Sequence, residues 1–306
     1  MAVIGTGTEV DPYIVNNWTD FCSVKDESGR YIFWEDLPTD QKIVDLNEEV
    51  PEGYSSAFTF ESKQIDFNGW TIRNLSIYIP GSLVSAIHLP TERLVAVIKN
   101  VKLLNCDFTA KSPISHNSYN SSKVYIYDSI ITGAWNSTST SGDSHYDDRP
   151  CLFRCSVNLN VNIAPSGKDD WTFTPIQSIM RFNILSQKSG SGPHITLKSE
   201  DNGNIKEHDN KFIIDITTPN VTNKNTTTVM RIIDRRNSVY VVTSDARCEY
   251  GETSGSNKWN YVSLVRSDNV NDVYNVALFK SVTDEQLKDP DYLYSLGFPI
   301  ATGVGS

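Results

Sequence analysis

The feature that most constrains the fold is a recurrence of about 27 residues in a chain that has almost no helical patterning. Short β-branched and aromatic runs alternate with clusters of Asn, Gly, Ser and Asp, which is typical of an all-β protein with many short strands. The runs are Gln64–Ile79, Leu94–Phe108, Lys123–Ile131, Leu152–Ile163, Ile179–Leu185, Lys211–Thr217 and Ser238–Thr243. The polar residues that punctuate these runs are Asn74, Asn100, Asp128, Cys155, Asn183, Asn210 and Asn237, separated by 26, 28, 27, 28, 27 and 27 positions.

A period near 27 is about one turn of a wide parallel β-solenoid. We therefore predict an all-β fold, a single-stack right-handed parallel β-helix with about 27 residues per coil and capped ends. Because such coils present wide, partly apolar faces that cyclic symmetry can bury, we expect a trimer. The predicted organisation is an acidic N-terminal cap and attachment region at 1–60, the β-helix at 61–280 and a C-terminal cap at 281–306. A sandwich or jelly roll with regular strand spacing is the alternative.

The recurring polar residues have a structural explanation. Asn and Asp tolerate the left-handed backbone of a tight corner, because their short side chains hydrogen-bond locally. Stacked on one another, such side chains can form a ladder. The predicted corner ladder consists of Asn74, Asn100, Asp128, Asn183, Asn210 and Asn237.

Both ends of the chain depart from the repeat, as the ends of a solenoid must. A short helix is expected to start at Asn17–Phe21, with Trp18 and Phe21 facing inward. A capping box at Thr283–Gln286 predicts a second short helix that ends before Pro290. The aromatic and apolar residues after Pro290 are expected to fold over the last coil.

Charge narrows the classes of function. The 306 residues carry a net charge of −10, and residues 1–60 hold 12 acids against three bases. An acidic chain without a basic stripe is unlike a nucleic-acid-binding protein, and no apolar run is long enough to span a bilayer. The N-terminus shows neither the basic nor the apolar part of a signal peptide. The acidic end is either a solvated face or a surface that docks on a basic partner.

Five cysteines, at positions 22, 106, 151, 155 and 248, form no metal-site spacing. We interpret them as free core thiols of a chain made in a reducing cytoplasm. We expect no metal and no cofactor.

Two stretches resemble a known class of protein. The opening Gly5-Thr6-Gly7-Thr8-Glu9-Val10-Asp11-Pro12-Tyr13-Ile14-Val15 resembles the segment that leads into the first coil of bacteriophage right-handed β-helix proteins of the tailspike and fibre kind. The closing Gln286–Asp289 and Ser295–Ile300 are similar to the tails of such chains. The resemblance implies a virion structural protein, usually a homotrimer, made in the host cytoplasm and displayed on a phage head or tail. The chain departs from long tailspikes in having no separate anchoring domain.

Two kinds of chemistry remain open at the level of sequence. A polysaccharide hydrolase or lyase needs acids and bases around the scissile bond, and the best candidates are Asp143, His145, Asp147, Asp148 and Arg149 in one polar loop. Aromatic rings beside polar loops could stack on a sugar, and the candidates are Trp135, Tyr146 and Trp171. For both groups a structural role is the favoured interpretation.

We therefore expect a phage fibre, spike or capsid-decoration protein. Its partners would be copies of itself, other virion proteins and host-surface polysaccharide. A capsular-polysaccharide depolymerase is the main alternative. A bacterial adhesin or carbohydrate-binding module is the third, and it would need an export route.

Overall fold

The computed structural model describes residues 3–49, 58–59, 61–78, 87–89, 95–110, 113–116, 123–137, 150–162, 171–186, 195–198, 212–217, 228–233, 239–244, 246–251, 260–264 and 279–298. Helical segments are α1 (Trp18–Val24), the 3-10 turn η1 (Thr39–Gln41), α2 (Leu46–Glu49), α3 (Asp284–Lys288) and α4 (Pro290–Ser295). Across these ranges, no helix is long and apolar enough to cross a membrane.

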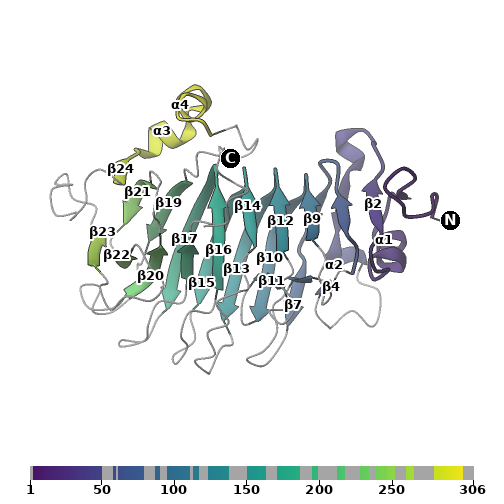
Figure 1. Cartoon of the computed structure of the whole chain (residues 1–306), viewed down its shortest axis with the longest axis horizontal. Helices are drawn as coiled ribbons and strands as arrows, with labels where there is room; N and C mark the ends of the chain where they lie inside the picture. Colours follow the sequence, from purple (N-terminus) through teal and green to yellow (C-terminus); the bar gives the residue numbers. More distant parts are fainter. Residues whose placement is uncertain are drawn as a thin grey trace.

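The strands form two large sheets and one small one. Within each large sheet the strands follow one another along the long axis of the molecule (Figure 1). The 11-stranded sheet contains, in spatial order, β1 (Tyr13–Val15), β2 (Tyr31–Trp34), β5 (Gln64–Asp66), β9 (Val95–Lys99), β12 (Lys123–Tyr127), β14 (Cys151–Phe153), β16 (Trp171–Ile176), β18 (Ile195–Lys198), β20 (Thr228–Ile233), β22 (Ala246–Gly251) and β23 (Asn260–Leu264). Neighbouring strands in it are parallel except β22 and β23, which are antiparallel.

The 10-stranded sheet is parallel as well. It contains β24 (Phe279–Ser281), β21 (Val239–Ser244), β19 (Phe212–Thr217), β17 (Ser178–Ser186), β15 (Ser156–Asn162), β13 (Ile130–Ser137), β10 (Lys102–Ala110), β6 (Thr71–Arg73) and β3 (Ile43–Asp45), with β7 (Ser76–Tyr78) paired beside β10. The three-stranded sheet consists of β11 (Ile114–His116), β8 (Ile87–Leu89) and β4 (Phe58–Thr59).

The all-β class with parallel sheets is therefore correct, but the prediction of a single-stack right-handed β-helix is wrong. The described strands assemble into two large parallel sheets, and the uniform coil of about 27 residues is absent. Val157 pairs with Met180, 23 positions later, and Met180 pairs with Ile214, 34 positions later. A recurrence in sequence gives only the average separation of strands that pair in one sheet. It fixes neither the number of sheets nor the path of the chain between them.

The two sheets enclose the core because their strands alternate apolar and polar residues. In β12, Val124 and Ile126 are buried while Tyr125 and Tyr127 face the other side. Aromatic side chains fill much of the space between the sheets. At the N-terminal end the Trp34 ring lies 4.8 Å from that of Trp70, between ring centroids.

The N-terminal helix closes one end of the stack (Figure 1). As predicted, a short helix forms here and Trp18 and Phe21 are buried. Asn17 caps it by accepting a hydrogen bond from the backbone N–H of Asp20. The predicted cap and attachment region at 1–60 also contributes strands to both large sheets. Within it, β1 and β2 are strands of the 11-stranded sheet and β3 belongs to the 10-stranded sheet. Apolar side chains of the first strands join the common core.

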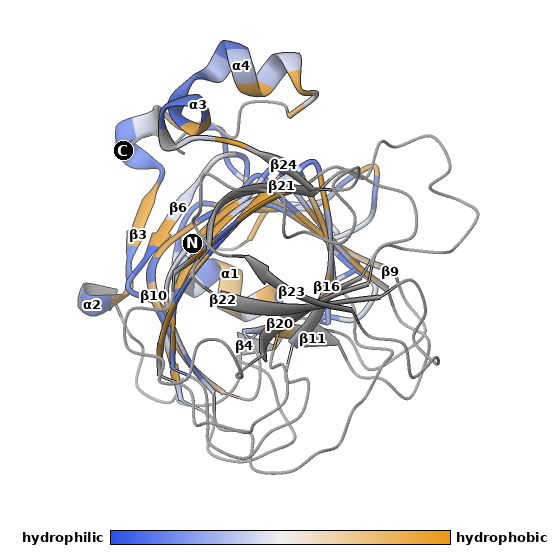
Figure 2. Ribbon diagram, turned by 90° about the vertical axis from the view of Figure 1, so that its left-hand side faces the viewer, coloured by the Kyte–Doolittle hydropathy of each residue, from blue (hydrophilic) through white to orange (hydrophobic). Residues whose placement is uncertain are grey.

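The C-terminal helices also form where the sequence predicts them. Thr283 and Gln286 make the reciprocal capping box, α3 ends at Lys288, and α4 starts at Pro290. Their position differs from the prediction, because Leu287, Leu293 and Phe298 pack on Ile179 and Ile213 of β17 and β19. The neighbouring residues Met180 and Ile214 point into the core. The helices therefore cover the outer face of the 10-stranded sheet (Figure 2) and do not fold over the last strands of the stack.

Candidate functional site

A column of left-handed residues runs along the corner where the chain passes from the 11-stranded to the 10-stranded sheet. Its members are Asn68, Asn100, Asp128, Arg154 and Gln177, with φ values of 47°, 60°, 51°, 52° and 49°. Backbone amides tie neighbouring corners together. For example, the N–H of Asn100 donates to the carbonyl of Tyr127 at 3.1 Å, and the N–H of Asp128 donates to Phe153 at 3.0 Å. The corner is thus a repeated, hydrogen-bonded turn.

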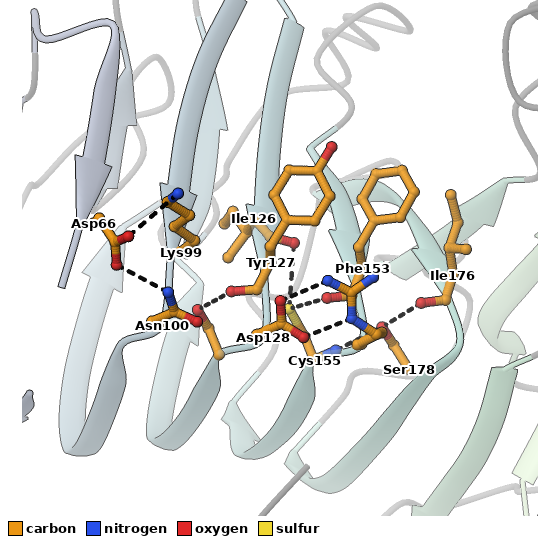
Figure 3. Close-up of polar contacts among 12 residues, drawn as sticks. Asp66, Lys99, Asn100, Ile126, Tyr127, Asp128, Phe153, Cys155, Ile176 and Ser178 are labelled. Carbon is orange, nitrogen blue, oxygen red and sulfur yellow. Dashed lines mark hydrogen bonds and ion pairs between the residues drawn. The ribbon is translucent and has the colours of Figure 1, made fainter. Parts of the chain in front are cut away.

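Side chains on this corner form ion pairs between neighbouring strands, and side-chain amides donate hydrogen bonds across them (Figure 3). Asp66 accepts a hydrogen bond from the side-chain amide of Asn100 at 2.9 Å, and its other oxygen lies 3.2 Å from Lys99 Nζ. Further along, the guanidinium of Arg154 donates two hydrogen bonds of 2.6 Å to Asp128. The charges of these groups are therefore compensated on the corner itself.

The predicted ladder is only partly placed on this column. Asn100 and Asp128 lie on it, and the next two corner residues are Arg154 and Gln177. The next predicted member, Asn183, lies inside β17 and donates to Asn160 at 3.0 Å. The reason is that paired residues of β14 and β16 are only 23 positions apart, as in Cys151 and Thr174. An even spacing of 27 therefore predicts a corner residue beyond the actual one, Gln177. Asn210 and Asn237 lie outside the described residues.

Asn74 belongs to a second corner, between β6 and β7, with φ at 59°. Its side-chain amide donates to Asp45 at 2.7 Å, and Asn105 donates to its oxygen at 2.5 Å. The hydrogen bond from Asn74 holds the pKa of the partly exposed Asp45 carboxyl below its usual value. Other side-chain bonds on the outer face of the 10-stranded sheet join Asn136 to Asp107, Asn162 to Asn136 and Asn183 to Asn160.

The two tryptophans proposed for glycan binding lie in the core. Trp135 and Trp171 are 0% and 2% exposed, and their rings meet edge to face at 5.9 Å. The indole N–H of Trp135 donates to the carbonyl of Ala110 at 3.2 Å. Neither ring can stack on a sugar at the surface, because the strand alternation of β13 and β16 turns both inward. The third candidate, Tyr146, lies outside the described residues.

The aromatic groups that face outward were missed by the sequence reasoning. Tyr125 and Tyr127 of β12 join Cys151, Phe153 and Ile176 on the outer face of the 11-stranded sheet. The Tyr127 and Phe153 rings stack at 4.7 Å, and the Arg154 guanidinium lies 5.9 Å from the Tyr127 ring centre. The strict alternation in Lys123–Tyr127 was the available signal, since it sends both tyrosines away from Val124 and Ile126.

Three of the described cysteines, Cys106, Cys151 and Cys155, are buried, and two of these thiols are strongly shifted toward the protonated form. Burial raises the pKa of Cys106 to about 12 and that of Cys155 to about 12. Cys155 also donates toward the carbonyls of Phe153 and Ile126, at 3.3 and 3.4 Å. A thiol in this state is a poor nucleophile and a poor metal ligand at neutral pH. These two residues are structural.

The residues proposed for catalysis all lie outside the described residues: Asp143, His145, Asp147, Asp148 and Arg149. Within the part of the chain that the structure describes, no group of three or more His, Cys, Asp or Glu side chains is arranged to hold a metal ion.

The opening segment folds as a tight loop in front of β1. Gly5 and Gly7 have φ values of 96° and 72°. A side chain at Gly5 would collide with the backbone of Pro12, and a Cβ at Gly7 would lie 2.5 Å from the Tyr13 ring. Beyond the loop, the N–H of Ile14 donates to the carbonyl of Ile4 at 2.9 Å, in an antiparallel bridge that covers part of the edge of β1.

Comparisons with known proteins add little. No protein-family model and no curated protein matches the chain. Among solved structures, the chain is similar to one described as "a putative immunoglobulin A1 protease from Bacteroides ovatus", with 13% identity and a TM-score of 0.45 over 95% of this chain and 89% of that one. A likeness at this level carries no argument about fold or function.

Proposed function

We propose that this chain is a structural protein of a bacteriophage particle, a head fibre, spike or decoration protein, that acts as a homotrimer. In this proposal it is made in the host cytoplasm, joins other virion proteins through one end and displays the rest of its surface to solvent or to host glycans.

The observation that carries the proposal is the conformation of the opening segment. The residues that resemble the phage proteins, from Gly5 to Val15, form a loop that closes on Pro12 and Tyr13 and leads directly into β1. The two glycines of the motif stand where a side chain would collide. The likeness in sequence therefore coincides with one structural unit at the start of the first strand.

The polar side chains of the corner make structural contacts, which also supports a non-enzymatic component of the particle. Asp66 and Asp128 are held by Asn100, Lys99 and Arg154, and the surface amides bond to one another between strands. These interactions stiffen an elongated body, which suits a displayed structural protein.

The outer face of the 11-stranded sheet supports self-association. Tyr31, Phe33, Tyr125 and Tyr127 are only half-buried there, and the nearby charges of Asp128 and Arg154 are paired. Copies of a chain with net charge −10 repel one another, so an aromatic face on which acids are accompanied by bases, as Asp128 is by Arg154, is the favourable place for them to meet.

The test is the mass of the recombinant protein by light scattering, together with an unboiled SDS gel and mass spectrometry of purified source particles. We expect three times the mass of one chain, a band that survives unboiled SDS, and the chain in the particles at a fixed copy number. A monomeric mass would contradict the proposed trimer. Absence of the chain from purified particles would contradict the virion role.

A further inference from the structure

The N-terminal end exposes large hydrophobic side chains. Val10 is 93% exposed and Ile4 is 71% exposed, and Ile43 of β3, also near this end, is 41% exposed. Elsewhere in the described chain, the large hydrophobic side chains exposed to this degree are Tyr78 and Tyr294. Three exposed aliphatic side chains on segments at the same end of an elongated molecule indicate an interaction surface.

The loop that carries Val10 is held in a fixed shape. The N–H groups of Thr6 and Thr8 both donate to the carbonyl of Asp11, at 3.2 and 3.1 Å, and the Asp11 N–H donates back to Thr8 at 3.3 Å. The Thr6 hydroxyl donates to the Asp11 carboxylate at 2.9 Å. A loop already ordered in this way loses little conformational freedom when it binds.

The base of the same loop is fixed to the body. The N–H of Tyr31 donates to the carbonyl of Gly7 at 3.0 Å, and Arg30 donates to the carbonyl of Thr6 at 3.3 Å. The Tyr13 hydroxyl, whose ring packs on Gly7, donates to Glu27 at 2.7 Å. Val10 is therefore presented on a rigid projection, which we call the N-terminal knuckle (Thr6–Asp11).

Acidic side chains outnumber basic ones around the knuckle. The three bases of residues 3–47 are each in an ion pair: Lys25 with Asp26, Arg30 with Glu27 and Lys42 with Asp36. Six carboxylates remain outside these pairs, and two of them directly flank Val10. They are Glu9, Asp11, Asp20, Glu35, Asp40 and Asp45. One base from outside this stretch is also near the knuckle: the Lys63 ammonium lies 5.2 Å from the Tyr31 ring centre, and the Tyr31 hydroxyl donates to Glu9 at 3.3 Å.

We propose that the N-terminal knuckle is the attachment point, and that Val10, with Ile4, inserts into an apolar socket rimmed by lysine or arginine on another protein of the particle. The inference rests on the proposed function and decides which end of the molecule is anchored. The excess of carboxylates around an apolar tip selects a basic rim. It disfavours a second copy of this chain, whose own end is equally acidic.

The experiment uses source particles assembled without this chain and fluorescently labelled full-length protein. The affinity of wild type, Val10→Asp and Glu9→Lys is measured across a salt series, and Tyr294→Asp is the matched control. Tyr294 is 73% exposed on α4, so that variant adds the same charge to a similarly exposed site far from the knuckle. Thermal melting of each variant checks the fold.

We expect Val10→Asp to weaken binding at least about tenfold, as for a central contact residue, and Tyr294→Asp to bind like wild type. Glu9→Lys should bind more weakly and with a shallower salt dependence. If wild type binds but Val10→Asp binds equally well, the knuckle is not the attachment point. If only Tyr294→Asp is weakened, the C-terminal helices are the anchor and the inference is overturned. If wild type itself does not bind the particles, both the inference and the proposed function fail.

Discussion

Arg154 and Asp128 face each other on neighbouring turns of the corner, 26 positions apart, and are joined by two hydrogen bonds of 2.6 Å. Both residues are themselves in the left-handed conformation. The ion pair and the backbone conformation therefore act at the same place, and substitutions can separate them.

Arg154→Ala should lower the free energy of unfolding by about 0.5–1 kcal/mol, the value of a partly exposed ion pair. Arg154→Gly also removes the pair but relieves the left-handed strain, so it should be less destabilising than alanine by about 0.5 kcal/mol. Urea unfolding at low and high salt measures both effects, and salt should shrink the loss seen with either variant. Equal losses for the two variants would show that the backbone strain is negligible.

Gly133→Ala should be severely destabilising, by about 3 kcal/mol or more. Gly133 has φ at 143°, and a Cβ there would overlap the backbone of Cys106 on the paired strand β10. Gly69→Ala is the matched control, because Gly69 has φ at 79° with no atom within 4 Å of the added Cβ. The control should lose only about 1 kcal/mol, from conformation alone. Thermal and urea unfolding compare them, and similar losses would argue against the collision.

Trp70→Phe should cost about 1 kcal/mol more than Trp34→Phe. Both rings are buried, but the Trp70 indole N–H donates to the carbonyl of Glu35 at 2.9 Å. The buried indole N–H of Trp34 has no hydrogen-bond partner in the described structure. Trp34→Phe therefore also removes a buried, unsatisfied polar group, which offsets part of its cost. Urea unfolding of the two variants provides the comparison, and the reverse order would contradict this assignment.

Cys106 and Cys155 should resist alkylation in the native protein. With each pKa at about 12, roughly one thiol in ten thousand is ionised at pH 8, and burial blocks access as well. Iodoacetamide treatment at pH 8, followed by peptide mass spectrometry, should leave both unmodified until denaturant is added. Rapid labelling of either residue without denaturant would mean that the core opens there.

The contact between Asn74 and Asp45 should make stability depend on pH in the acid range. The hydrogen bond lowers the pKa of Asp45 in the folded state, so its stabilisation is present above the ordinary value of 3.8 and is lost as pH falls through the lowered value. The melting temperatures of wild type and Asp45→Asn should therefore differ at pH 6 and converge at low pH. Asn74→Gly keeps the left-handed corner and removes the first donor, so in that background the effect of Asp45→Asn at pH 6 should be smaller. What remains would come from the Asn47 backbone N–H, which also donates to Asp45 at 3.1 Å.

The short helices and the all-β class could be read from the sequence because their signals are local. Asn17 at the start of α1 and Thr283 with Gln286 at α3 satisfy backbone groups within three residues. The candidate site was harder to predict, because its contacts join residues of different strands, from 23 positions apart (Asn183 and Asn160) to 34 (Asp66 and Asn100). Arg154 was expected in no functional or structural role, yet it continues the corner that Asn100 and Asp128 occupy.

The sequence alone determined which residues favour strands, where left-handed turns are tolerated and where helices begin, because these depend on the backbone preferences of neighbouring residues. Only the tertiary structure decided the register. The steps of 23 and 34 positions beside Met180 show that links between strands vary in length, so an average period cannot say which residues meet. It also decided that Trp135 turns into the core while Tyr127 lies half-buried on the outer face, since the side of a strand that faces the core depends on the sheet packed against it.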